Sequence, residues 1–395
     1  MTYISADVPL ITIAIVTYEQ ENDLFGCIDS VLMQDYPNIE LIVCDDCSRV
    51  FDIKKLTDYI ETHKKRNLKQ YNLYRQAKNV GTVINCNTAI SMANGEIIKT
   101  LAADDRLYGI DTIAFIGAQF HSHNISILAG RGRCYLKDGT PTEQYYPTQN
   151  EFIRMKCKGP DQLLKMLCTR PWSCILAPAT AFHRNVFSQI GLFDTSYKYL
   201  EDWPFWIKAC VSGIPIHICE QTLVWYRFGG ISSLQERSAA AISAQRTFLR
   251  ECQAVLQHEG MIQMQSTRNP WCILQCKLSI DILFMREAQT LDFREWSGIH
   301  KISFMGAHFP SLIYQKILGA VGNSRYLPWR FMGMFFIGGA FFASFFWISC
   351  PGVWSNIYLG IAIVCGILAA GYLLANGILW GINAYLERKY KLNKG

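Results

Sequence analysis

Ile39-Glu-Leu-Ile-Val-Cys-Asp-Asp-Cys-Ser48 is the stretch that decides the fold class of this chain. Its first half is short, apolar and rich in β-branched residues, which predicts a buried strand over Ile39–Cys44, and the polar residues after it predict a turn. A similar apolar run, Leu10–Val16, precedes it, and apolar residues at helical spacing fill Asp23–Gln34 between the two runs. Strand, helix and strand in this order predict an α/β fold with a mostly parallel sheet.

Acidic pairs stand at the ends of three predicted elements. Asp45-Asp46 ends the strand just described, Asp104-Asp105 follows the predicted strand Ile97–Ala102, and Glu201-Asp202 begins the predicted helix Trp203–Val211. Ligands of open α/β sheets collect beyond the carboxyl ends of the strands, so we expect the pairs to meet in one concave site. Taken singly, each pair is also compatible with a helix cap or a turn.

These carboxylates suit the transfer of a sugar from a nucleotide diphosphate. Asp45 is expected to accept a hydrogen bond from a pyrimidine N–H, while Asp46 either fixes the turn or reaches the ribose. Asp104 and Asp105 offer the hard oxygen ligands that Mg²⁺ or Mn²⁺ prefers, and such an ion would bridge the diphosphate oxygens. Asp202, stabilised as an anion at a helix N-terminus, would be the base for the acceptor hydroxyl.

The same residues carry a resemblance to a known family. The stretch from Ser30 to Ser48 resembles the nucleotide-binding opening of family 2 glycosyltransferases, which have the GT-A fold. Asn79-Val-Gly81 and Leu101-Ala-Ala-Asp-Asp105 resemble the family's continuation up to its metal motif. Glu201-Asp202 and Leu223-Val-Trp-Tyr-Arg227 resemble its third block, so the resemblance spans about residues 8–233.

The resemblance implies an inverting transfer by direct displacement, with Asp202 as general base and Glu201 beside it. Asp104 and Asp105 would face the metal and the diphosphate. Arg227 would bind the diphosphate or order a loop, although a structural salt bridge is an equal alternative for it. The residues expected to bind the nucleotide sugar lie in these motifs: Thr17, Tyr18, Glu19, Asp45, Asp46, Asn79, Gly81, Asp104 and Arg227.

Three residues depart from the family's pattern. Glu19 stands where the family commonly has Asn, Cys47 where it commonly has Gly, and Ala102 where many members have another Asp. Cys47 is expected to strain a turn that favours positive φ. Ala102 leaves two carboxylates instead of three in the metal motif.

The C-terminal part of the chain is unusually apolar. Residues 331–386 contain no Asp, Glu, Lys or Arg, which predicts a hairpin of two transmembrane helices at about 331–349 and 358–381, with a buried core helix as the alternative. Basic residues on both flanks would place those flanks in the cytoplasm. The sequence thus predicts a multi-pass protein of the inner (cytoplasmic) membrane, with its catalytic domain on the cytoplasmic side.

We therefore predict four regions: a GT-A glycosyltransferase domain at 1–233, an amphipathic, juxtamembrane helical region at 234–330, the transmembrane hairpin at 331–386 and a basic cytoplasmic tail at 387–395. Within the second region, residues 299–321 would either lie among lipid headgroups or pack as ordinary helices.

The expected donor is a UDP-sugar, and the expected acceptor is a polyprenyl-linked saccharide in the assembly of a surface polysaccharide such as O-antigen or capsule. A polyprenyl-phosphate sugar synthase and a catalytically inactive, membrane-tethered binding protein are the alternatives. The net charge of +6 would favour contact with membrane lipids, and no basic stripe indicates nucleic acid. No Gly-x-Gly-x-x-Gly follows the first strand, which disfavours a dehydrogenase.

Overall fold

The computed structural model describes residues 8–123, 125–157, 159–230, 238–290, 297, 304 and 306–322. The chain divides into two compact units, residues 1–315 and 316–395. Of the second unit, only the end of helix α13 (Phe309–Gly322) is described. The first unit holds the sheet and all the residues of the candidate site.

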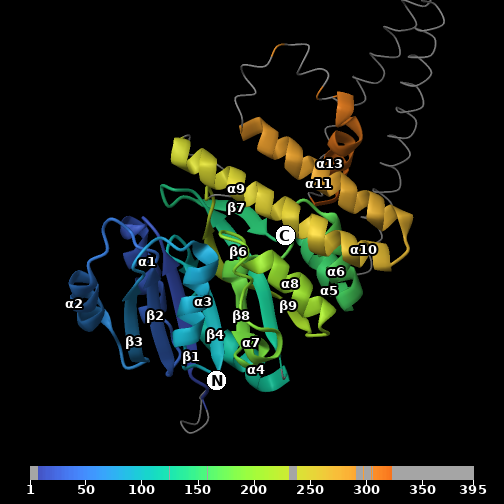
Figure 1. The fold of residues 1–395 in the computed structure, drawn as a ribbon. Coiled ribbons are helices and arrows are strands. Elements are labelled where there is room, and N and C mark those ends of the chain that lie inside the picture. The colour runs from blue at the N-terminus through green and yellow to red at the C-terminus, as the bar shows by residue number, and fades with distance from the viewer. Residues whose placement is uncertain are drawn as a thin grey trace, which may run out of the picture. The chain divides into compact units, whose positions relative to one another are not determined.

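The nine strands of the described residues form one sheet in the order β3-β2-β1-β4-β8-β6-β9-β5, with β7 paired to β6 (Figure 1). One half is parallel, as predicted, and consists of β1 (Ile11–Thr17), β2 (Ile39–Asp45), β3 (Leu68–Arg75) and β4 (Ile97–Ala102). The other half is mixed and consists of β5 (Arg106–Leu107), β6 (Ile127–Tyr135), β7 (Pro141–Tyr146), β8 (Thr180–His183) and β9 (Ile216–Arg227).

Helices cover both faces of the sheet. On one face lie α1 (Glu21–Leu32), α2 (Ile53–His63) and α4 (Thr112–His123). On the other lie α3 (Thr82–Met92), α5 (Gln149–Cys157), α6 (Gly159–Thr169), α7 (Asn185–Ile190) and α8 (Asp202–Val211). The unit is therefore a three-layer α/β/α arrangement, and its helix-covered sheet is the reason that the central strands are apolar on both faces.

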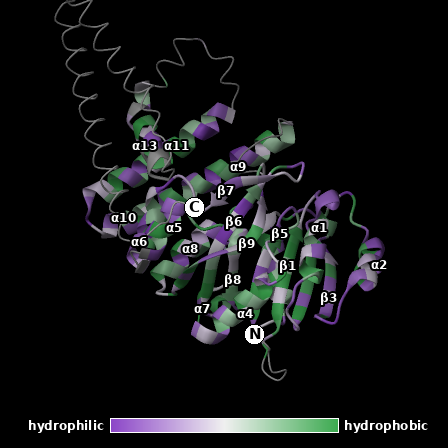
Figure 2. Ribbon diagram, turned by 180° about the vertical axis from the view of Figure 1, so that it is seen from behind, coloured by the Kyte–Doolittle hydropathy of each residue, from purple (hydrophilic) through white to green (hydrophobic). Residues whose placement is uncertain are grey.

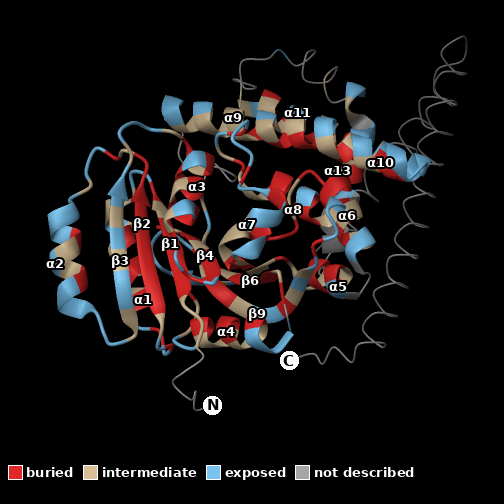
Figure 3. Ribbon diagram, turned by 60° about the horizontal axis from the view of Figure 1, so that its bottom comes forward, coloured by how far each residue is buried: buried red, intermediate tan, exposed pale blue. Residues whose placement is uncertain are grey.

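The alternation of side chains along the strands divides the core in two. Ile13 and Ile15 of β1 belong to the cluster under α1 and α4, whereas Ala14 between them belongs to the cluster under α3. All three are fully buried. The central strands accordingly form a buried, apolar band, while α2 lies at the exposed edge (Figures 2 and 3).

A second group of helices packs on the face that carries α8. Ser238 caps α9 (Ala239–Val255) by accepting a hydrogen bond of 3.2 Å from the Ala241 N–H. The helix does not end after Val255, because a π-helical turn, Leu256–Gly260, leads directly into α10 (Met261–Ser266). After α10, α11 (Pro270–Thr290) returns alongside α9 (Figure 1).

The membrane part of the predicted fold class is corrected. Within the described residues, no helix combines the length and the apolar character needed to cross a bilayer. The longest of them, α11, has 21 residues but carries Lys277, Asp281, Arg286 and Glu287. The findings support the α/β fold without a transmembrane hairpin, so the multi-pass inner-membrane localisation is corrected with it. The two predicted spans and the basic tail themselves lie outside the described residues.

Candidate active site

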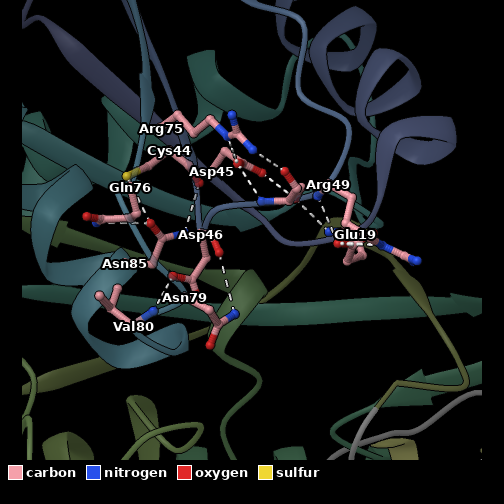
Figure 4. Close-up of polar contacts among 11 residues, drawn as sticks. Glu19, Cys44, Asp45, Asp46, Arg49, Arg75, Gln76, Asn79, Val80 and Asn85 are labelled. Carbon is pink, nitrogen blue, oxygen red and sulfur yellow. Dashed lines mark hydrogen bonds and ion pairs between the residues drawn. The ribbon is translucent and has the colours of Figure 1, made fainter.

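Asp45 organises the turn that follows β2. Its carboxylate is fully buried and accepts hydrogen bonds from the Ser48 N–H, at 2.8 Å, and from the Ser48 hydroxyl. The Arg75 Nε lies 3.6 Å from the same carboxylate (Figure 4). The Ser48 hydroxyl also accepts a 2.8 Å bond from the Glu19 N–H, which ties the end of β1 to this turn. Asp45 therefore holds the turn together.

Two residues near Asp45 have left-handed backbone conformations. The φ angles are 56° at Glu19 and 64° at Cys47. The strain predicted at Cys47 is confirmed, since a side chain in this region crowds the following carbonyl oxygen. Glu19 is held by its own side chain, whose Oε1 accepts bonds from Arg49 N, at 2.9 Å, and Arg49 Nε, at 3.2 Å.

Asp46 fixes the loop that leads into α3. Its two carboxylate oxygens accept hydrogen bonds from the N–H groups of Val80, at 2.6 Å, and Gly81, at 2.8 Å, and its carbonyl accepts one of 3.4 Å from the Asn79 side chain (Figure 4). Burial raises the pKa of Asp46, although these two N–H groups oppose the shift. Of the two roles predicted for Asp46, the contacts favour fixing the turn over reaching a ribose.

Gly81 connects that loop to the segment that carries Glu201 and Asp202. Its φ is +91°, and a Cβ atom there would lie 2.5 Å from Lys198 Cγ and 2.8 Å from Lys198 O, so only glycine fits. The Val83 N–H donates to the same Lys198 carbonyl at 3.2 Å. On its other side, the Lys198 N–H donates to Glu251 Oε1 at 2.7 Å. The segment before the third acidic pair is therefore clamped between α3 and α9.

Asp202 begins α8 and turns its carboxylate back over the first turn of that helix. Oδ1 accepts a 2.7 Å bond from the Trp203 N–H, and Oδ2 lies 3.4 Å from the Trp206 indole nitrogen. Burial raises the pKa values of both Glu201 and Asp202, and the charge of Asp202 raises that of Glu201 further. Asp202 is thus the member of the pair that ionises first, which suits a base.

A buried thiol marks the convergence of two acidic pairs. Cys86 of α3 has a pKa well above its usual range because of its burial and the nearby charges of Glu201, Asp202 and Asp46, among others. Asp46 and Asp202 are far apart in the sequence but act on this one side chain. Asp46 and Asp202 thus both lie near enough to Cys86 for their charges to act on it.

Asp104 and Asp105 meet Arg227 where β5 pairs with β9. Arg227 Nε and Nη2 donate to Asp104 Oδ2 at 3.0 and 2.9 Å, and the Arg227 N–H donates to Asp105 Oδ1 at 2.8 Å. A third guanidinium nitrogen, Nη1, lies 2.8 Å from Asp23 Oδ2 on α1. Burial and the neighbouring Asp104 charge raise the pKa of Asp105 well above its usual range.

These contacts do not fit a metal held by Asp104 and Asp105 together. Asp104 already accepts two bonds from a guanidinium, and Asp105 is only 2% exposed, with one oxygen on a backbone N–H. Throughout the described part of the chain, no three His, Cys, Asp or Glu side chains gather in a group that could hold a metal ion. Arg227 is the cation that neutralises Asp104 in this arrangement.

A pocket opens between the carboxyl ends of β1 and β2 and the helices α1 and α2. It is a shallow, partly open hollow, and Thr17 and Asp45 are among the predicted residues that line it. Phe25, Phe51 and Lys55 also line it and were not predicted. Lys55 Nζ lies 5.1 Å from the centre of the Phe25 ring. Of these three, only Phe51 carried a signal in the sequence, as an apolar residue shortly after the acidic turn.

The comparisons with known proteins agree with this architecture. Residues 12–190 match the model of glycosyl transferase family 2. Those residues form a glycosyltransferase family 2 domain. An uncharacterized glycosyltransferase of Rickettsia prowazekii is 29% identical over 211 residues, which cover 51% of this chain and 58% of the relative. A PGL/p-HBAD biosynthesis glycosyltransferase of Mycobacterium bovis is 25% identical over 229 residues, covering 57% and 80%.

The chain therefore spans 58% of the length of the rickettsial relative. Among solved structures, the chain is similar to S. aureus TarS 1-349 in complex with UDP-GlcNAc, with 17% identity, a TM-score of 0.45 and coverage of 72% of this chain and 82% of that one.

Proposed function

We propose that this glycosyltransferase moves a sugar from a nucleotide diphosphate, with a UDP-sugar as donor, to an acceptor hydroxyl with inversion at the anomeric carbon. One observation carries the proposal. The pocket beside Asp45 and the Arg227–Asp104 pair lie where β1, β2 and β4 finish, and Lys198, four residues before Asp202, packs against Gly81 of the loop that Asp46 holds.

The pocket lined by Phe25 and Phe51 would take the nucleobase, with Asp45 in its wall. Asp23, two residues before Phe25 on α1, contacts Arg227, so the diphosphate would extend from the pocket toward the Arg227 guanidinium. A planar guanidinium matches phosphate oxygens with two parallel hydrogen bonds. Mn²⁺ or Mg²⁺ would supply similar neutralisation only after Arg227 releases Asp104, so we assign no step to a metal.

Asp202 would act as the base. As the acceptor oxygen attacks the anomeric carbon, its proton passes to Asp202, and the bond from that carbon to the diphosphate oxygen breaks on the opposite side. The nucleoside diphosphate leaves with the electron pair of that bond. The sugar then carries the inverted configuration, and no covalent link to the enzyme forms.

For the acceptor we propose a lipid-linked saccharide. The supporting observation lies on α10 and α11, where Ile262, Trp271 and Leu274 are 61%, 72% and 42% exposed. Exposed Trp and aliphatic side chains beside basic residues suit contact with a lipid surface. A polyprenyl phosphate is the second candidate, since it would be delivered by the same kind of surface.

The test is a donor screen on the full chain in detergent. We expect one UDP-sugar to be hydrolysed slowly without acceptor and transferred faster once a polyprenyl-diphosphate saccharide or a polyprenyl phosphate is added. Asp202→Asn should bind the same nucleotide with unchanged affinity and transfer sugar about 10²–10⁴-fold more slowly. Transfer at the wild-type rate in Asp202→Asn would remove the base, and nucleotide binding by the wild type without any turnover would favour the inactive binding protein.

A further inference from the structure

Three arginines and one glutamate form a cluster in the helical layer that carries Asp202. Arg170, directly after α6, pairs with Glu151 of α5 at 2.7 Å, and the two side chains are only 6% and 4% exposed. The same Glu151 oxygen accepts a 3.1 Å bond from the Trp172 indole. Arg286 of α11 lies over that indole, 5.9 Å from its centre. We call Arg154, Arg170 and Arg286, with Trp172, the arginine cluster.

Arg154 and Arg286 lack acidic partners within the described residues. Neither is within ion-pair distance of a carboxylate, and each is partly exposed. Burial lowers the pKa values of both, and the charge of Arg170 lowers that of Arg154 further. Since Glu151 compensates only one of the three guanidinium groups, two positive charges remain in a partly desolvated place. Such an arrangement costs free energy unless an anion occupies it.

The cluster lies in the same helical layer as the base, since the indole N–H of Trp203, next to Asp202, donates to the Leu167 carbonyl at 2.9 Å, three residues before Arg170. The Ser279 hydroxyl of α11 donates to the Thr169 carbonyl, beside Arg170, at 2.7 Å, and Arg286 follows about two turns further along α11. The charge of Arg286 acts on Cys252 and Tyr146. The charge of Asp202 acts on the same two side chains. The cationic cluster and the base therefore flank a common pair of residues.

We propose that the arginine cluster is a subsite for a phosphate group on the acceptor. Guanidinium groups bind phosphate through paired hydrogen bonds, and a dianionic phosphate monoester matches the two uncompensated charges. The exposed part of the Trp172 ring would contact the apolar face of a neighbouring sugar or isoprenoid unit. This inference rests on the proposed function and deepens it, because it selects phosphate-bearing acceptors over neutral ones.

The phosphate belongs either to a lipid headgroup or to a soluble sugar phosphate, and two probes separate these sources. Equilibrium binding to the full chain would be measured for farnesyl phosphate in detergent micelles and for glucose 6-phosphate, with farnesol and glucose as the uncharged counterparts. We expect at least one phosphate probe to bind and its uncharged counterpart to bind about tenfold or more weakly. The probe that binds identifies the source.

The variants are Arg286→Gln and Arg154→Gln, with Arg250→Gln as the matched control, because Arg250 pairs with Glu287 at the α9–α11 contact. Each test variant should weaken binding of the phosphate probe about tenfold, and Arg286→Lys should recover part of that loss. Arg250→Gln should leave the affinity for the phosphate probe unchanged. UDP binding should stay within twofold of the wild type in all of them, which also shows that each variant is folded.

Phosphate binding that is unaffected in both Gln variants would overturn the subsite, as would equal binding of charged and uncharged probes. If neither phosphate probe binds while UDP does, the subsite falls and the proposed function stands. If the wild type fails to bind or hydrolyse any nucleotide sugar, the proposed function falls, and the acceptor role of the cluster falls with it.

Discussion

Arg227 holds Asp104 through two hydrogen bonds to one oxygen, 3.0 Å from Nε and 2.9 Å from Nη2. The pair is largely shielded, with side-chain exposures of 16% for Arg227 and 13% for Asp104. Because Nη1 of the same guanidinium reaches Asp23, Arg227 joins the end of β9 to both the β4–β5 turn and α1. A ligand that binds Arg227 must therefore compete with Asp104, and a metal ion that binds Asp104 must compete with Arg227.

We expect Arg227→Gln to change nucleotide and metal binding in opposite directions. Loss of the guanidinium should weaken UDP binding about tenfold or more, as expected when a hydrogen bond to a charged group is lost. It should also free the Asp104 carboxylate, so that Mn²⁺, followed by electron paramagnetic resonance, binds about tenfold more tightly than to the wild type. Calorimetric titration with UDP gives the other half of the measurement.

Arg133→Gln is the control for that prediction, since Arg133 pairs with Glu143 on the neighbouring hairpin instead of with Asp104. It should alter neither affinity. UDP binding that is as tight in Arg227→Gln as in the wild type would mean that Arg227 is only a structural salt bridge, the alternative that the sequence left open.

The pH dependence of transfer should separate the roles of Asp202 and Glu201. Burial raises the pKa of Asp202, so the base is protonated at acidic pH and the rate should rise with pH through a value above that of an ordinary aspartate. Burial and the Asp202 charge raise the pKa of Glu201 still further, so Glu201 is neutral while Asp202 titrates. Replacing Glu201 with the neutral glutamine should therefore leave the pH midpoint of this acid limb unchanged.

The measurement is kcat against pH for wild type, Glu201→Gln and Asp202→Asn. Asp202→Asn should reduce kcat by about 10²–10⁴ at pH values above the acid limb, which is the usual contribution of a general base, and the limb itself should disappear. An acid limb that moves to lower pH in Glu201→Gln would show that Glu201 is charged in the active form and would contradict this order of ionisation.

The parallel half of the sheet could be predicted because its strands are short apolar runs that end at polar turns. β4 has the predicted bounds, and β2 ends only one residue later than predicted. Most of the mixed half could not, because β9 mixes apolar and polar residues without a regular period and pairs with β6, a strand remote in the sequence. Local patterns carry little information about such pairings.

The residues of the candidate site could likewise be predicted only in part. The acidic pairs were found because strand ends collect ligands, but the sequence did not distinguish a carboxylate that binds a ligand from one that holds a loop. Asp46 belongs to the second kind, since both of its oxygens are used by backbone N–H groups. Phe25 was missed because the helical pattern of α1 selects the buried face, whereas Phe25 lines the pocket.

Asp46→Asn should destabilise the protein by about 1–3 kcal/mol, because an amide can accept from only one of the two N–H groups and leaves the other unpaired. Urea unfolding would measure it, with Asp52→Asn as the control. Asp52 accepts a single 3.0 Å bond from the Lys55 N–H as an N-cap, where asparagine is equally suited. Equal stability of Asp46→Asn and the wild type would contradict the clamp on Val80 and Gly81.

Cys47→Gly should stabilise the protein despite removing a side chain. Cys47 has a φ of 64°, and a left-handed conformation costs a residue with a Cβ atom roughly 1–2 kcal/mol. Glycine avoids that cost but has more freedom to lose on folding, which offsets about 0.5–1 kcal/mol, so the net gain should be about 0.5–1 kcal/mol. Cys47→Ala, which keeps the Cβ atom, is the matched variant and should gain nothing. If alanine stabilises as much as glycine, the strain is not in the backbone, and the turn beside Asp45 owes its shape to the hydrogen bonds of Ser48 alone.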